Sequence, residues 1–240
     1  MFFRFFKLFL VFLFLITELT AQKKDIKKLT IGPFFGLKVY SGLEVRLISS
    51  NINKAIIYGK NSDNVIVTLH KDILKIKLSV LSALKPGPTY IDLYHSNHLN
   101  KIKVHQGSKL SADKVLKQKQ LELEATTGAT IMLDAITERT KVIVSTGGLT
   151  YLKGETSFFD LKGNTGGICE AENFKAIQVN TKMIAAGYSY VSSSNRLDAK
   201  VIAGGVLRVF GNPIKQITYE MLGGKIYIEN KEASSGFEPL

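Results

Sequence analysis

The chain contains little of the chemistry on which most catalytic and metal-binding sites depend. Its 240 residues include one cysteine and four histidines, and no histidine follows His105. The single thiol, Cys169, has no second cysteine for a disulfide within the chain, and a catalytic thiol would need a histidine nearby. The sequence also shows no recurring carboxylate pair, no Ser-His-Asp arrangement and no phosphate-binding loop. We therefore expect no enzyme activity, no catalytic residues and no cofactor, with Cys169 a small buried core residue.

The histidines allow one metal-site hypothesis. His95 and His98 lie close to Asp92 in the sequence, so an Asp-His-His site is one interpretation. In an extended segment, however, side chains three residues apart point to opposite faces, and a metal site needs three or four convergent ligands. The spacing favours a solvated loop, and we expect no metal.

A long apolar run occurs only at the start of the chain. Residues 1–21 combine Arg4 and Lys7 with the apolar stretch Leu8–Ile16 and the small-residue exit Leu19-Thr20-Ala21, which is the pattern of a secretion signal. The run is shorter than the roughly 20 residues that a membrane span needs. No cysteine stands at the cleavage point, which excludes lipid attachment there. We expect an exported protein of the periplasm, the outer-membrane surface or the extracellular space.

Basic side chains outnumber acidic ones, 32 to 20, which gives a formal net charge of +12. Such a balance is typical of proteins that bind nucleic acid, but export argues against a nucleic-acid partner, and we expect none. Two interpretations stay open. Lysines on outward strand positions keep a sheet surface soluble and discourage edge pairing. Alternatively, they attract anionic lipopolysaccharide or acidic glycan at the cell surface.

A small-residue corner returns six times between Thr126 and Ile228. Taking the second residue of each corner pair as the origin, the steps are 19, 19, 20, 18 and 19 residues. A fixed period is typical of a repeat architecture, in which each unit buries its apolar face on its neighbours. The predicted structural corners contain Gly128, Gly147, Gly148, Gly166, Gly167, Gly187, Gly204, Gly205, Gly223 and Gly224.

Side chains around each corner alternate with a period of two. The positions two and four residues after the origin, and two residues before it, are small or apolar in every repeat, whereas the odd positions are mixed. This pattern predicts strands with the even positions facing inward. At about 3.3 Å per residue, one repeat supplies roughly 60 Å of chain, enough for two or three short strands. A small or absent Cβ at the corner lets successive rungs approach closely. The predicted fold is all-β, a parallel β-helix or a closely related β-solenoid.

The corners resemble those of a known family. Thr146-Gly147-Gly148, Thr165-Gly166-Gly167 and Ala203-Gly204-Gly205, with the opening segment Phe34–Val45, resemble the head-GIN-domain family of bacterial auto-transporter adhesins. The resemblance covers roughly residues 30–230. The family's corner usually reads Ser-Gly-Gly-Ser-Asp, whereas here Thr or Ala replaces the Ser and the Asp is absent. The resemblance implies a β-solenoid with an adhesin-like role and carries over no catalytic residues.

The repeats account for only part of the chain, and the other segments have their own expected roles. We expect the signal peptide at 1–21, an irregular β portion or cap at 22–104, the solenoid repeats at 105–230 and a disordered tail at 231–240. Alternating residues on both sides of His70-Lys71-Asp72 predict a hairpin within the cap.

One outward column is the candidate binding site. Three residues after the origin stand Tyr151, Tyr190, Arg208 and Tyr227, with Glu170 interrupting the row. Stacked at roughly 4.8 Å per rung, they would form a ladder suited to sugars or partner proteins. The simpler interpretation is that tyrosine stabilises its cross-strand neighbours.

Two functional hypotheses follow from the predicted solenoid. One is a non-catalytic, adhesin-like module that binds glycan or protein through a solenoid face. The other is a structural envelope protein that self-associates. A polysaccharide-acting enzyme ranks third, because β-helices host such enzymes but the carboxylate cluster they need is not visible.

Overall fold

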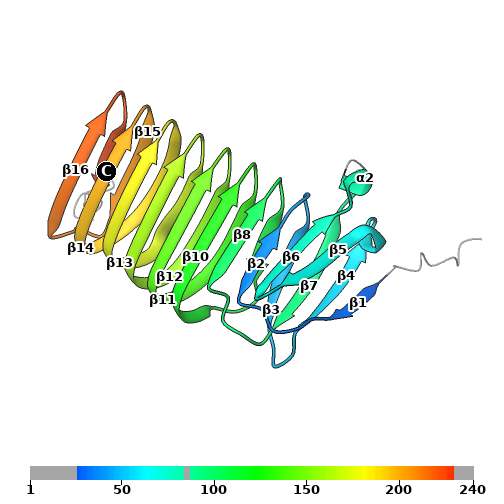
Figure 1. Cartoon of the computed structure of the whole chain (residues 1–240). Coiled ribbons are helices and arrows are strands. Elements are labelled where there is room, and N and C mark those ends of the chain that lie inside the picture. The colour runs from blue at the N-terminus through cyan, green and yellow to red at the C-terminus, as the bar shows by residue number, and fades with distance from the viewer. Residues whose placement is uncertain (1–25, 84–86, 230–240) are drawn as a thin grey trace, which may run out of the picture.

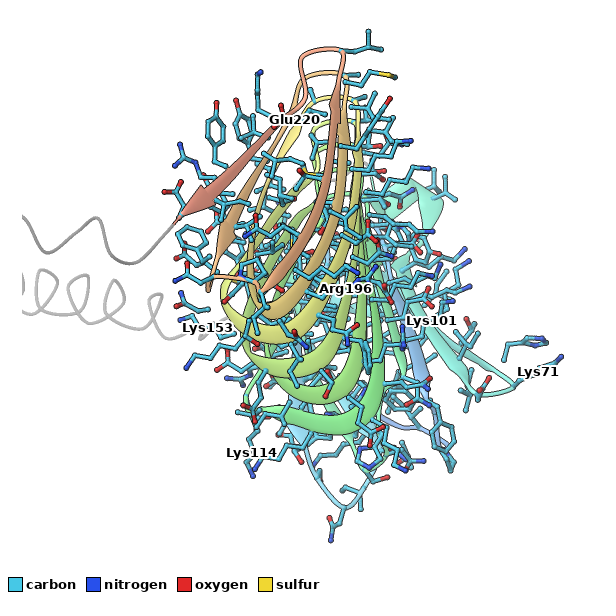
Figure 2. All side chains as sticks on the ribbon, turned by 90° about the vertical axis from the view of Figure 1, so that its left-hand side faces the viewer. Lys71, Lys101, Lys114, Lys153, Arg196 and Glu220 are labelled. Carbon is cyan, nitrogen blue, oxygen red and sulfur yellow. The ribbon has the colours of Figure 1, made fainter. Side chains whose placement is uncertain are left out.

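The computed structural model describes residues 26–83 and 87–229, and these form the predicted β-solenoid, with about seven turns. Figure 1 shows the turns as a stack of strands, with tight corners along one edge and wider bends along the other. Each turn enters one sheet directly after a corner, rounds a bend, and returns through a second sheet to the next corner. We call the outer surfaces of these sheets the post-corner face and the pre-corner face. In Figure 2 the labelled Lys153 of the post-corner face and Lys101 of the pre-corner face lie on opposite sides.

The regular turns pair in parallel. Four of the strands run from one corner, around a bend, to the next. They pair in parallel in chain order, and the register shifts only at the bends on both sides of β13. The last rung consists of two shorter strands, one in each sheet. The strands are β10 (Leu116–Thr126), β11 (Thr130–Ser145), β12 (Leu149–Asn164), β13 (Ile168–Ile184), β14 (Gly187–Ile202), β15 (Gly205–Phe210), β16 (Lys215–Met221) and β17 (Lys225–Glu229).

The first part of the chain also forms a rung. Strands β2 (Gly36–Val39) and β3 (Glu44–Ser49) flank a corner and pair in parallel with later strands on both sides. On one side lie β8 and β9, and on the other lie β6 and β7. Those strands are β6 (Ile73–Leu78), β7 (Thr89–His95), β8 (Lys101–His105) and β9 (Lys109–Ala112).

Antiparallel strands close the N-terminal end of the solenoid. β1 (Lys27–Thr30) pairs with β4 (Lys54–Gly59), and β4 pairs with β7. β5 (Val65–His70) pairs antiparallel with β6, which confirms the predicted hairpin. Helical structure within the described residues is limited to α2 (Val80–Ala83) and a short 3-10 turn. The expected signal peptide and the expected tail lie outside the described residues.

Four of the corners contain two glycines in succession, and the two positions have different roles. At the corner before β12, Thr146 and Gly147 both adopt positive φ, 51° and 70°, so the chain reverses within two residues. Glycine adopts this conformation without strain. The third residue, Gly148, directly precedes β12, and a Cβ there would lie 2.0 Å from the carbonyl oxygen of Ala125. The first glycine is therefore required by backbone conformation and the second by space.

One expectation about the corners is wrong. The residues two positions before the origin, such as Thr127 and Thr146, were predicted to face inward. They lie instead on the exposed outside of the corner with positive φ, because the two-residue reversal ends the strand alternation before it reaches them.

The residue at the third corner position becomes smaller along the solenoid. The register places Leu43, Ser108 and Ala129 in the same column as the later glycines, and all three are fully buried. The corner is therefore wide enough for a side chain in the early rungs and closes onto the backbone in most of the later ones. The column continues through Gly148, Gly167, Gly187, Gly205 and Gly224.

The inward columns after the corner are confirmed. Ile131, Leu152 and Val191 are buried, and Cys169 is fully buried in the same core, where burial raises the pKa of its thiol. Pro213, between β15 and β16, is buried, and most of the described residues after it are exposed.

Thr150 offers a test of this core. Its hydroxyl oxygen is buried and has no hydrogen-bond partner. An unpartnered buried hydroxyl costs about 1–3 kcal/mol, and valine keeps the branched shape. We expect Thr150→Val to raise the free energy of unfolding by about 1 kcal/mol, which corresponds to an increase in melting temperature of about 2–4 °C.

The matched control for this prediction is Thr137→Val. The Thr137 hydroxyl lies 2.7 Å from the Thr140 hydroxyl and 2.8 Å from that of Thr156. Loss of the Thr137 hydroxyl should destabilise the protein, because the hydroxyls of Thr140 and Thr156 would stay buried without this hydrogen-bond partner. A lower melting temperature for both variants would contradict the prediction for Thr150.

Candidate functional site

The predicted tyrosine ladder is present on the post-corner face. The register places Tyr151 on β12, Tyr190 on β14 and Tyr227 on β17 in one row. Glu170 separates the first two and Arg208 the last two, as the spacing predicts. Tyr227 is 47% exposed, whereas Tyr151 and Tyr190 are half-buried by their neighbours. The rings therefore form part of the outer surface and do not enter the core.

Arg208 is fixed within the row. Its Nη1 donates a hydrogen bond to Glu229 Oε1 at 2.8 Å, and its guanidinium lies 5.3 Å from the centre of the Tyr227 ring. An arginine held over an aromatic ring presents a flat, weakly hydrated surface as well as charge. Because Glu229 already pairs with it, Arg208 supplies shape and hydrogen-bond donors more than net charge.

A second outward column lies next to the ladder, and the sequence analysis missed it. One residue after the origin, five successive rungs carry Thr130, Leu149, Ile168, Tyr188 and Val206. Tyr188 is 55% exposed, and Leu149, Ile168 and Val206 are partly exposed. Treating all odd positions as one mixed class hid this column, whereas tabulating each odd position separately reveals it. The apolar and aromatic residues of the two columns form what we call the aromatic face, which consists of Met132, Leu149, Tyr151, Ile168, Tyr188, Tyr190, Val206 and Tyr227.

A depression adjoins the aromatic face at the bends. It has a volume of about 900 Å³, and Met132 and Tyr151 border it beside Asp134, Lys153 and Glu172. A second depression of about 660 Å³ shares Glu172, so the two lie in succession along the bends. Aromatic rings beside charged hydrogen-bonding groups suit a ligand with both apolar and polar faces, such as a sugar.

The residues of the metal-site hypothesis have other contacts. Arg46 of β3 donates two hydrogen bonds to the carboxylate of Asp92, at 3.0 and 2.9 Å. His95 is buried with its Nδ1 3.0 Å from the carbonyl oxygen of Asn97, whereas His98 is exposed. Within residues 26–83 and 87–229, no three His, Cys, Asp or Glu side chains are grouped so that they could hold a metal ion.

Taken together, the fold and the surface define a β-solenoid that presents an exposed aromatic face. The chain belongs to the family described as putative auto-transporter adhesin, head GIN domain, whose sequence profile matches residues 33–213. None of the curated proteins matches the chain. Among the helices in the described part of the chain, none has the length and apolar character to cross a membrane.

Solved structures share the fold at low sequence identity. A putative adhesin from Bacteroides fragilis NCTC 9343 is 16% identical with a TM-score of 0.76, and the match covers 87% of this chain and 98% of that one. A putative lipid binding protein from Parabacteroides distasonis ATCC 8503 is 10% identical with a TM-score of 0.65, covering 88% and 98%. A putative adhesin from Parabacteroides merdae ATCC 43184 is 15% identical with a TM-score of 0.60, covering 88% and 98%. The family and these relatives are named as adhesins or binding proteins and not as enzymes.

Proposed function

We propose that the protein is an exported, non-catalytic adhesin-like module that binds glycan or protein through its aromatic face. The observation that supports this most is the alignment of Tyr151, Tyr190 and Tyr227 beside the apolar column that contains Tyr188. Export relies on the secretion signal expected at residues 1–21, and the site of action is the periplasm, the outer-membrane surface or the extracellular space.

The composition of the aromatic face supports a binding role. Exposed apolar groups gathered in one patch are typical of interaction surfaces, whereas scattered ones are ordinary. Tyrosine contributes a large rigid contact area and a hydroxyl at a low entropic cost. The patch extends over successive rungs, so it fits an extended ligand such as an oligosaccharide or a peptide strand. The adhesin names of the family and of two of the relatives agree with this role.

The C-terminal end of the solenoid argues against the alternative, a structural protein that self-associates. Within the described chain, β16 and β17 have no strand on their outer side. The register turns Gln216, Thr218 and Glu220 of β16 toward the inside, where earlier rungs have apolar residues. Glu220 Oε1 also accepts a hydrogen bond from the backbone N–H of Ile226 at 2.6 Å. Polar inward residues discourage the stacking of a second molecule on this edge.

A glycan array tests the proposal. The mature protein is expected to bind at least one oligosaccharide, and replacing Tyr151, Tyr190 and Tyr227 with serine should weaken that binding about tenfold or more, since each ring contributes stacking of about 0.5–1.5 kcal/mol. Because the three rings lie on the surface, the melting temperature should fall comparatively little.

The matched control replaces Phe158 and Tyr219, two exposed aromatic residues of the pre-corner face, with serine. This variant should bind like the unmodified protein. Equal binding by the triple variant would contradict a role for the aromatic face in recognition, and light scattering of the same samples reports any self-association.

A further inference from the structure

A row of lysines lies on the pre-corner face, opposite the aromatic face. The register places Lys162 of β12, Lys182 of β13 and Lys200 of β14 on directly neighbouring positions of parallel strands. All three are exposed. Adjacent strands lie about 4.8 Å apart, and like charges placed directly opposite one another destabilise a sheet. Three successive lysines are therefore an arrangement that the fold alone does not favour.

The same row continues toward the N-terminal end. Lys103 of β8, Lys38 of β2 and Lys75 of β6 occupy it in order along the solenoid. Only Glu124 and Ile143 interrupt the row between the two groups of lysines. Six lysines thus follow one line that runs along the length of the solenoid. We call this line the lysine row.

Most of these lysines lack a carboxylate partner. Lys103 pairs with Glu124, but among the described residues no ion pair reaches Lys38, Lys75, Lys162, Lys182 or Lys200. In the described part of the chain, the ammonium groups of two of them contact aromatic rings. The Lys75 ammonium lies 5.2 Å from the centre of the Tyr40 ring, and the Lys200 ammonium lies 4.8 Å from that of Tyr219.

The carboxylates nearest to the lysine row are already paired with other cations. In the adjacent outward row, Asp160 accepts a hydrogen bond from Arg139 at 3.0 Å, and Asp198 accepts one from Arg196 at 3.4 Å. Glu122 lies 3.0 Å from the Lys101 ammonium. Burial alone would raise the pKa of Glu122, but its hydrogen bond to Lys101 and the nearby lysine charges lower it. The positive charge of the lysine row is therefore left for an anion from outside the chain.

We propose that the lysine row binds a single linear polyanionic glycan of the polyuronate class, with its carboxylates aligned along the solenoid axis. An extended chain of uronic acids carries one carboxylate per sugar ring and repeats on the same scale as the strands of a sheet. The lysines can therefore pair, as separate point-charge donors, with the carboxylates on the side of the glycan chain that faces the sheet. This site is distinct from the aromatic face and does not depend on it.

The shape of the charged region favours a chain over a membrane. Beside Lys162, Lys182 and Lys200, the adjacent outward row contains Asp160, Asn180 and Asp198 and no lysine. A planar anionic membrane pressed against this face would also meet those carboxylates. A single glycan chain laid along the row meets only one carboxylate within it, that of Glu124, which is paired with Lys103. The net charge of +12 adds a long-range attraction that brings an anionic chain to the surface.

The test measures binding of a polygalacturonate oligomer of defined length by calorimetry. The unmodified protein should bind at low salt, and its affinity should fall steeply as salt is added, because exposed charges are screened. Replacing Lys162, Lys182 and Lys200 with glutamine should weaken binding about tenfold or more, since each exposed charge pair contributes up to about 1 kcal/mol. The same variant should melt at an equal or higher temperature at low salt, because it removes like-charge repulsion.

The matched control replaces Lys28, Lys60 and Lys119 with glutamine, which removes the same charge away from the lysine row. This control should lose less than about threefold in affinity, since only long-range attraction is reduced. An equal loss in both variants would mean that net charge alone governs binding and would overturn the site. An absence of binding to polygalacturonate would also overturn the proposed site. Tighter binding to phosphatidylglycerol vesicles than to the glycan would overturn it as well. The Tyr151, Tyr190 and Tyr227 triple serine variant should keep its polygalacturonate affinity, which separates this result from the proposed function.

Discussion

Replacement of Gly148 by alanine is expected to lower the free energy of unfolding by about 3 kcal/mol, the upper part of the range for overpacking. The added Cβ would lie 2.0 Å from the Ala125 oxygen and 2.6 Å from its carbonyl carbon, both backbone atoms of the neighbouring rung. Backbone in a paired strand moves only if the rung spacing changes. In a chain of this size the melting temperature should fall by about 6–12 °C.

Gly205→Ala is the matched control, at the same corner position two rungs after Gly167. The nearest atom to its added Cβ is a side-chain methyl of Val201 at 3.1 Å, which can adjust. We expect a loss below about 1 kcal/mol. Gly167, where the Cβ would lie 2.5 Å from the Val144 oxygen, should behave like Gly148. Equal melting temperatures for Gly148→Ala and Gly205→Ala would show that the corner glycines are not limited by space.

Replacement of Phe174 by alanine is expected to cost about 3–5 kcal/mol, the usual loss for a buried phenylalanine. Phe174 is fully buried and packs edge-to-face against Phe159, with ring centres 5.5 Å apart. It lies where the register between β13 and its neighbours shifts, and this irregularity accompanies the 20-residue repeat. Chemical denaturation of the variant measures the loss directly.

The ring pair itself is tested by a double-mutant cycle with Phe159→Leu and Phe174→Leu. Edge-to-face contact should give a coupling energy of about 0.5–1.5 kcal/mol beyond the separate losses. Additive losses would mean that the two rings fill space independently. A loss below about 1 kcal/mol for Phe174→Ala would contradict its place in the core.

The period of the sequence was enough to predict the regular turns. Each repeat places the same residue types at the same offset, so the inward columns that contain Ile131 and Leu152 could be recognised by comparing rungs. The tyrosine ladder followed from the same comparison, because parallel in-register stacking keeps a fixed offset in one row. The chemistry of that row, including the Arg208–Glu229 pair, depends on two segments 21 residues apart and was not visible from offsets.

Other features could not be read from the period. The rung of β2 and β3 lies between strands that come later in the chain, and no local pattern specifies that order. The exposed corner residues such as Thr127 were misassigned because alternation was extended through a reversal that requires positive φ. The lysine row crosses several strands whose repeats are irregular before residue 116. The row can be recognised only when the pairing of β2, β6 and β8 is combined with the pairing of β10 to β14.

The central claim is that ligand is held on the aromatic face, and oxidative footprinting of the unmodified protein with its strongest array ligand tests this most directly. The side chains of Tyr188, Tyr190 and Tyr227 should be oxidised more slowly when the ligand is bound, because it covers their rings. Phe158 and Tyr219, exposed on the opposite face, should be oxidised at an unchanged rate. Protection of Phe158 and Tyr219 with no change at the three tyrosines would contradict the claim.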